Sequence, residues 1–268
     1  MNNVFDFRRF GKYFTYDLVN AKNNYWLSLL ITGLLPVISY VISQMLGRLF
    51  TGEWYQGALA TQISSFCAAI VVVSMGFSAK AYGRITERRA GSSWLMIPAS
   101  SFEKFLSMII ISCVVVPVLL GILLFGSDAL MSLIIPSYGK PLFYYVSNVN
   151  GFIAEELADS LSLNVPALIA VSWASSILPF LLGAIFFKKS KVGKTFLALI
   201  GLSIVLSMIS SVFMNGLVLD VEDLFCLGGS FTGEEFFRRF NLLMNILSTV
   251  SIGTLLVLIY LRVRTIKL

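Results

Sequence analysis

The chain has 268 residues, of which 57% are hydrophobic and 13% are charged, and its mean hydropathy is +0.85. A soluble domain usually carries about 25% charged residues, so this composition argues against a water-soluble protein and predicts an integral membrane protein. The net charge is +6 and histidine is absent, which excludes His-ligated metal sites and metalloprotease motifs such as H-E-x-x-H. The three cysteines are too scattered for a C-x-x-C pair or a disulfide framework.

Residues 4–25 form the first predicted element, an amphipathic helix. At about 100° per residue, its apolar residues fall on one narrow stripe and its basic residues lie across from it. This pattern predicts a helix in the membrane interface, with the basic side toward anionic headgroups. The alternative is an ordinary basic flank before a membrane span. The stripe consists of Phe7, Phe10, Phe14, Leu18, Ala21 and Tyr25, and the opposite side carries Arg8, Arg9, Lys12, Thr15, Tyr16 and Asn23.

Six apolar segments follow, each long enough to cross about 30 Å of hydrocarbon. Backbone polar groups in lipid must be paired within the segment, so each is expected to be a helix. Pro36 is expected to kink the first, and Pro179 lies inside the fourth. None contains Asp, Glu, Lys or Arg, which proton- and ion-coupled carriers usually place at membrane depth. We therefore predict an all-α polytopic protein forming one transmembrane domain over residues 1–268, with spans at about 26–46, 58–79, 105–125, 166–187, 196–218 and 242–261.

Lysine and arginine predict the orientation of these spans. Sixteen of the twenty fall in the N-terminal segment, the 80–104 and 188–194 loops and the C-terminal tail. Basic loops stay on the cytoplasmic side, so both termini are expected to be cytoplasmic, in a multi-pass protein of the cytoplasmic (inner) membrane. The other side carries only Arg48, Lys140, Arg238 and Arg239.

The segment 80–104 is the longest polar interruption on the basic side. Gly91 and the serines after it loosen the preceding helix, and Pro98 disfavours helix at the residue before it. Ser100-x-x-Glu103 is then a capping box that predicts the start of the next helix. We interpret this elbow as a docking surface for a cytoplasmic partner. The alternative is a solvated loop whose charges only fix orientation.

The two outer loops also contain signals. Residues 126–165 mix aromatic and acidic residues, which predicts short helices on the outer interface. Residues 220–240 contain a Gly-Gly break followed by a second capping box, Thr232-x-x-Glu235, before the last span. Two interpretations stay open there, a half-inserted helix with a capped return or an interfacial loop.

Motifs for catalysis or nucleotide binding are not convincing. Gly193-Lys194-Thr195 resembles the end of a P-loop, but Lys188 stands where the earlier glycine is required, and a membrane span precedes it instead of a strand. Paired glutamates such as Glu155 and Glu156 are better explained as interface charges. We expect no catalytic residues, no cofactor and no nucleic-acid partner.

The layout resembles the permease subunit of ABC exporters of the type-2 export class. The local resemblance lies in the phrases at 87–91, 97–100 and 103–104: a charged helix end and glycine, a proline followed by small residues, and a basic residue re-entering the membrane. The resemblance implies that the elbow is a coupling helix on a separate ATPase subunit, with a second permease copy or paralogue completing the transporter. The expected partner-binding residues are Arg84, Glu87, Arg88, Arg89, Gly91, Trp94, Pro98, Ser100, Glu103 and Lys104.

The main hypothesis is thus a transport subunit surrounded by membrane lipids. The rival is a non-transporting membrane interaction protein, such as an immunity, assembly or sensor component. A membrane-embedded enzyme is disfavoured because the chain has no histidine and the predicted spans contain no acidic residue.

Overall fold

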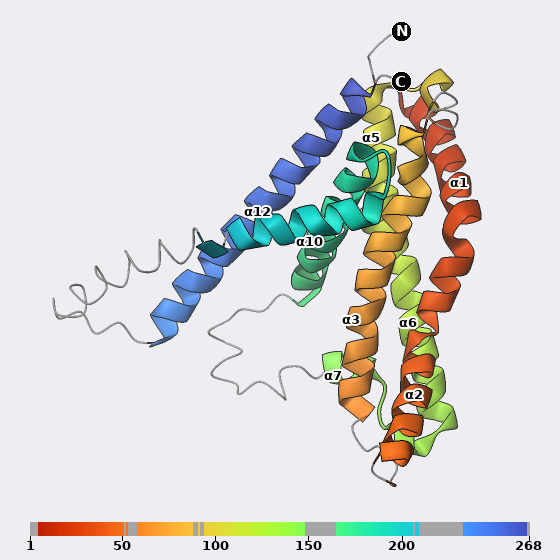
Figure 1. The fold of residues 1–268 in the computed structure, drawn as a ribbon, viewed down its shortest axis with the longest axis vertical. Helices are drawn as coiled ribbons and strands as arrows, with labels where there is room; N and C mark the ends of the chain where they lie inside the picture. The colour runs from red at the N-terminus through yellow and green to blue at the C-terminus, as the bar shows by residue number, and fades with distance from the viewer. Residues whose placement is uncertain are drawn as a thin grey trace, which may run out of the picture.

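The computed structural model describes most of the chain, in the ranges 5–50, 52, 58–87, 91, 94–147, 165–205, 207–208 and 233–266. All regular structure in these ranges is helical. Four helical runs are long and apolar enough to cross a membrane, at Phe7–Phe50, Leu59–Thr86, Ser101–Ile134 and Asn245–Thr265. The protein is therefore all-helical, and these runs indicate a multi-pass membrane protein (Figure 1).

The first run is bent where α1 (Phe7–Gly33) meets α2 (Leu35–Phe50). Asp6 caps α1, since its side chain accepts a hydrogen bond of 2.9 Å from the backbone N–H of Arg8. The helix is interrupted at Leu34, and Pro36, which has no backbone N–H, follows in the first turn of α2. The expected kink near Pro36 is confirmed, and the helix is interrupted two residues before the proline, at Leu34.

α1 passes without a break through the boundary predicted near residue 25, between an interfacial helix over 4–25 and a first span over 26–46, because residues 20–30 contain neither glycine nor proline. The interfacial position of residues 4–25 stays a prediction. The buried face of α1 overlaps only part of the predicted stripe: Ala21 and Tyr25 are buried, whereas Phe7 at its start is 82% exposed. The buried residues of α1 are Tyr13, Asp17, Ala21, Tyr25, Leu29, Thr32 and Gly33.

The second and third predicted spans are parts of longer helical runs. α3 (Ala58–Phe77) continues through a π-helical turn, η1 (Ser78–Tyr82), and a 3-10 turn, η2 (Gly83–Thr86). The third run is α5 (Ser101–Ile110), a second π-helical segment, η3 (Ile111–Val115), and α6 (Val116–Ile134). It extends past both ends of the predicted 105–125 span and so includes Glu103, Lys104 and Asp128.

Short helices follow α6, as expected for the start of the 126–165 loop. They are η4 (Pro136–Tyr138) and α7 (Leu142–Ser147). The remainder of that loop, residues 148–164, lies outside the described residues, as do residues 209–232, which hold most of the second outer loop and Thr232 of its capping box.

The described residues after 164 form three helices. α10 (Val165–Phe186) matches the predicted fourth span and keeps Pro179 within it. A helix over 191–208, with residue 206 outside the described set, covers the first part of the predicted fifth span. α12 (Gly233–Thr265) contains the predicted sixth span and extends beyond both its ends.

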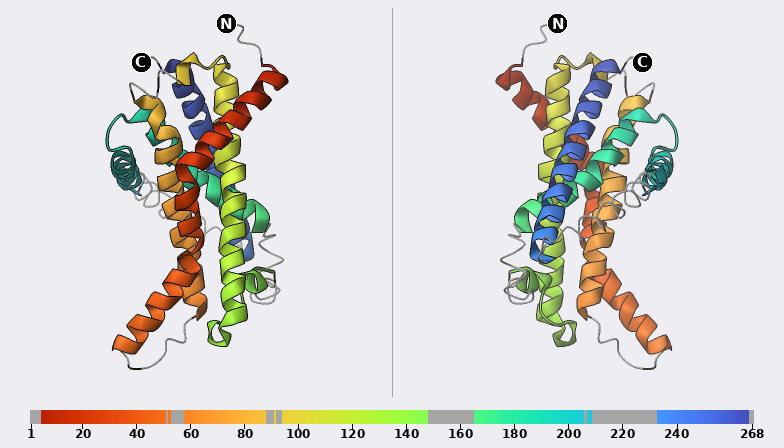
Figure 2. Two further views of the ribbon diagram at one scale, coloured as in Figure 1. Left: turned by 90° about the vertical axis from the view of Figure 1, so that its right-hand side faces the viewer. Right: turned by 90° about the vertical axis from the view of Figure 1, so that its left-hand side faces the viewer.

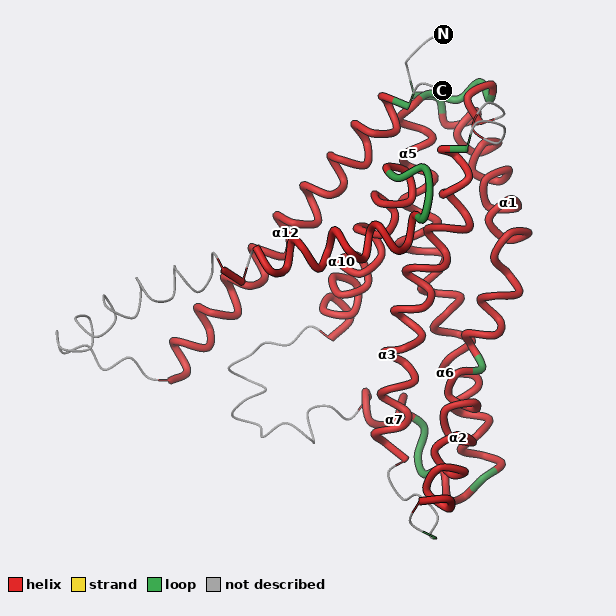
Figure 3. The backbone as a smooth tube through the Cα atoms, in the orientation of Figure 1, coloured by secondary structure: helices red, strands yellow, loops and turns green. Residues whose placement is uncertain are grey.

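The core lies where α1, α3, the α5–α6 run, α10 and α12 meet. Leu181 and Ile185 of α10, Val73 of α3 and Ile259 of α12 are fully buried there. The start of α1, the end of α12 and the connection into α5 lie at one end of the molecule, while the far ends of α2 and α6 lie at the other (Figures 1 and 2). Loops within the described part are short and join the ends of helices (Figure 3).

Candidate functional site

The candidate site is the elbow between η2 and α5, at the end of the molecule that also holds both termini (Figure 1). The predicted capping box at its end is confirmed. The backbone N–H of Glu103 donates to Ser100 Oγ (3.2 Å), and the backbone N–H of Ser100 donates to Glu103 Oε2 (2.9 Å). Because the side chain of each residue accepts a hydrogen bond from the backbone N–H of the other, the first turn of α5 has a fixed direction.

Glu103 also fastens the elbow to the N-terminal end of α1. It accepts hydrogen bonds from Arg9, with Nη2 2.6 Å from Oε1 and Nε 2.9 Å from Oε2, and from the backbone N–H of Asp6 at 3.1 Å. The side chain of Glu103 has no exposed surface. Glu103, which was expected to face a partner, therefore makes its contacts within the chain.

Trp94 and Lys104 also point toward the interior of the chain. The Lys104 ammonium donates to the Trp94 carbonyl (2.8 Å) and lies 4.4 Å from the centre of the Trp94 ring. The Trp94 indole N–H donates to Tyr13 Oη of α1 at 3.2 Å. Trp94 is half-buried and Lys104 is buried, so both side chains stabilise the elbow on α1.

The other side of the elbow is braced by two neighbouring segments. Arg84 donates to Asn24 Oδ1 of α1 (3.1 Å). Lys191, at the start of the helix over 191–208, pairs with Glu87 at 3.2 Å and donates to the Gly83 carbonyl. The 80–104 and 188–194 segments, both predicted from their basic residues to lie on one side of the membrane, are therefore in direct contact.

An exposed apolar tip remains on the elbow. Leu95 is 39% exposed and Met96 is 81% exposed, in the short helical stretch after Trp94. Neither residue was among the predicted partner-binding residues, although two large apolar side chains in a polar loop were a usable signal. Of the other predicted partner-binding residues, Gly91 is buried and Pro98 is exposed, while Arg88 and Arg89 lie outside the described residues.

A buried carboxyl group lies behind the elbow. Asp17 of α1 accepts hydrogen bonds from Ser107 Oγ of α5 (2.7 Å) and Tyr82 Oη of η1 (3.3 Å). Asp17 and Ser107 are buried. The contacts of Asp17 join α1, η1 and α5 at the base of the elbow. No short sequence pattern predicted them.

A second polar cluster lies at the opposite end of the molecule. Asp128 of α6 accepts hydrogen bonds from Tyr138 Oη and from the backbone N–H of Leu142 (2.6 Å). Burial raises the pKa of Tyr138 well above its ordinary value, and its hydrogen bond to Asp128 acts in the same direction, so the phenol stays a proton donor. Gln62 Nε2 donates to the Lys140 carbonyl at 3.2 Å. These contacts tie the loop after α6 onto α3 and α6.

In the described ranges, no three side chains of His, Cys, Asp or Glu lie close enough together to hold a metal ion. No family model, no curated protein and no solved structure matches the chain. Its function is therefore inferred from the contacts described above.

Proposed function

We propose that this chain is the transmembrane permease subunit of an ABC exporter, with energy supplied by a separate ATPase subunit that docks on the 80–104 elbow. In this proposal the chain crosses the membrane six times, with both termini in the cytoplasm. A second permease copy or paralogue completes the transporter. Four long apolar helices among the described residues support a multi-pass membrane protein, and the division of lysine and arginine supports the cytoplasmic position of both termini.

The observation that carries the proposal is a braced elbow with an apolar tip. A subunit without an ATP-binding motif must receive force through a contact, and that contact has to be rigid. Glu103, Trp94 and Lys104 hold one side of the elbow on α1, and the Glu87–Lys191 pair holds the other. Leu95 and Met96 project from this frame, and exposed apolar side chains surrounded by polar residues are typical of protein contacts.

This arrangement changes which residues are proposed to bind the ATPase. In the proposal Leu95 and Met96 make the central contact, and Pro98, Arg84 and Glu87, which are also exposed on the elbow, contribute to the same surface. Trp94, Ser100, Glu103 and Lys104 position this surface from behind. Truncation of Trp94 is therefore a poor test of docking, because it also removes the hydrogen bond to Tyr13.

Co-purification of an ATPase subunit tests the proposal. The tagged chain is expressed in its native host and extracted in detergent, and any captured ATPase subunit is identified and quantified by mass spectrometry. Met96→Asp is expected to reduce capture about tenfold or more, as for an apolar residue at the centre of an interface. Ser190→Asp is the matched control, since it adds the same charge to the exposed neighbouring loop and is expected to leave capture unchanged.

Two results would contradict the proposal. If the wild-type chain captures no ATPase, the coupled-transporter assignment fails and a non-transporting interaction protein replaces it. If Met96→Asp captures as much ATPase as Ser190→Asp does, the elbow tip is not the docking surface.

A further inference from the structure

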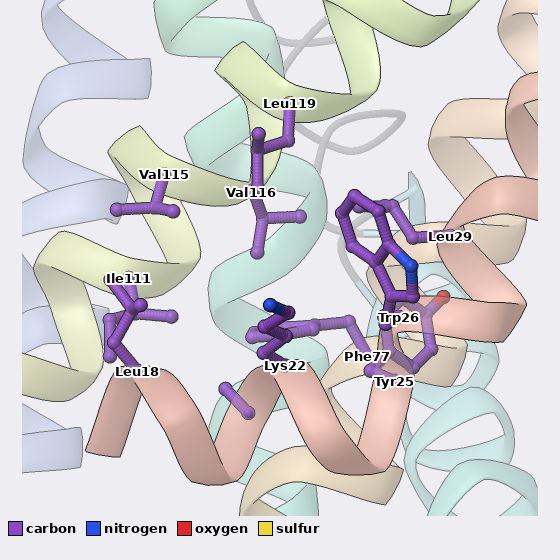
Figure 4. Close-up of a pocket in the computed structure, with 11 residues that line it drawn as sticks. Leu18, Lys22, Tyr25, Trp26, Leu29, Phe77, Ile111, Val115, Val116 and Leu119 are labelled. Carbon is purple, nitrogen blue, oxygen red and sulfur yellow. The ribbon is translucent and has the colours of Figure 1, made fainter. Parts of the chain in front are cut away.

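A groove of about 100 Å³ lies between α1 and the η3–α6 segment, away from the elbow tip. Its lining is predominantly apolar, and Lys22 is the charged residue in it. Figure 4 shows Lys22 and Trp26 on the α1 side, facing Val115 and Leu119 on the other. The groove is smaller than an apolar cavity of about 150 Å³, which holds a benzene-sized molecule, so it has room for a few methylene groups of one hydrocarbon chain.

Two polar donors at the groove have no polar partner within the described part of the chain. Lys22 is exposed, and its ammonium lies 6.0 Å from the centre of the Trp26 ring. The indole N–H of Trp26, a side chain that is 41% exposed, is the second donor. A cation and an N–H beside an apolar slot are complementary to a molecule that carries both an anionic group and a hydrocarbon chain.

Other cations lie at the same level of α1. Lys80 donates to Ser28 Oγ (2.7 Å), and Arg84 donates to Asn24 Oδ1 (3.1 Å). Together with Lys22 they place three positive charges beside one stretch of α1, where Trp26 also lies. Tryptophan, lysine and arginine are enriched at the boundary between headgroups and hydrocarbon, so this level fits the headgroup region of a bilayer.

We propose that the groove is a binding site for one anionic phospholipid. Its acyl chain lies between α1 and the η3–α6 segment, and its phosphate accepts hydrogen bonds from Lys22 and Trp26. The lipid chain fills the space between α1 and the η3–α6 segment. This inference requires only that α1 is embedded in a membrane and is independent of the transport role.

Native mass spectrometry of the delipidated full chain tests the site. The chain is titrated with equal amounts of phosphatidylglycerol and phosphatidylcholine, and the first bound lipid is identified. The wild type is expected to prefer phosphatidylglycerol. Lys22→Gln is expected to weaken that preference about fivefold, the effect of one basic residue near an anionic surface. Lys12→Gln removes an exposed lysine from the same helix, outside the groove, and is expected to retain the full preference.

Two further arms separate the site from its alternatives. Val115→Trp fills the groove and is expected to lose the first phospholipid regardless of headgroup. Inorganic phosphate at millimolar concentration is expected not to compete, because it lacks the acyl chain. The proposal is overturned if the wild type shows no headgroup preference, if Lys22→Gln and Lys12→Gln behave alike, or if Val115→Trp binds the first lipid as the wild type does.

Discussion

Arg9 binds both carboxylate oxygens of Glu103 across 94 positions of sequence, through Nη2 at 2.6 Å and Nε at 2.9 Å. The planar guanidinium matches the carboxylate in this bidentate geometry, which a lysine does not reproduce. The pair joins the first turns of α1 and α5, so the N-terminal segment is a structural part of the elbow.

Glu103→Gln is expected to lower the unfolding temperature by weakening this pair. Glutamine still completes a capping box, so the loss reports mainly on Arg9. A double-mutant cycle with Arg9→Gln, followed by thermal unfolding in detergent, is expected to give a coupling energy clearly above zero. The same cycle with the exposed neighbour Arg8→Gln is expected to give none, and equal coupling in both cycles would refute the pairing. Ser100→Ala, which removes only the cap, is expected to cost about 1 kcal/mol.

Two buried serines on one helical run make a matched pair. Ser107 Oγ donates to Asp17, whereas Ser112 Oγ has no hydrogen-bond partner in the described part of the chain. Ser107→Ala leaves a buried carboxyl group short of a donor and is expected to destabilise the protein by about 1–3 kcal/mol. Ser112→Ala is expected to be neutral or slightly stabilising. Denaturant unfolding in mixed micelles measures both, and equal losses would show that Asp17 does not depend on Ser107.

Replacement by alanine is expected to change the free energy of unfolding in opposite directions at two glycines. A Cβ at Gly183 of α10 would overlap Oγ1 of the buried Thr195, while a Cβ at Gly193 meets nothing within 4 Å. Gly183→Ala is expected to destabilise by about 1–3 kcal/mol through overpacking. Gly193→Ala, in a helix, is expected to stabilise by about 0.4–1 kcal/mol. Melting temperatures of the two purified variants decide this, and a shift of the same sign would contradict the close packing at Gly183.

Labelling of single cysteines tests the topology. Ser190 and Ser137 are both exposed; Ser190 adjoins Lys191, which contacts the elbow, whereas Ser137 lies in η4, after α6. In a cysteine-free background, Ser137→Cys is expected to react with an impermeant thiol reagent in intact cells, and Ser190→Cys only after permeabilisation. Equal labelling in intact cells would overturn the proposed orientation.

Local features of the fold were predictable from the sequence. The Ser100–Glu103 cap was found because its partners are three residues apart, and the break near Pro36 follows from the chemistry of proline itself. Apolar stretches longer than a membrane crossing identified the helices. Their ends were less accurate, because a helix continues past the hydrocarbon wherever its polar end finds contacts, as α6 does at Asp128.

Long-range contacts were not predictable from the sequence. Nothing within a few residues of Glu103 indicates Arg9, and nothing near Asp17 in the sequence indicates that Tyr82 and Ser107 hold it inside. For the same reason, several elbow residues predicted to bind a partner make contacts within the chain, whereas the exposed Leu95 and Met96 were not predicted. Trp94 has the chemistry of an interface residue, but its burial depends on Tyr13, which lies on a helix that the sequence alone could not place beside it.

The π-helical segment η3 sets the rotational phase between the two ends of the third run. Ser107, before it, faces Asp17, and Ser127, after it, donates to the Gly33 carbonyl at 2.7 Å. In this segment each turn is wider than the about 3.6 residues of a regular α-helix, so its five residues advance the run through a smaller angle than five α-helical residues would. If the same residues closed into regular α-helical turns, everything beyond them would rotate about the helix axis, and Ser127 and Asp128 would point away from their partners while Ser107 kept its own. The wide turn thus decides which side of α6 meets α1.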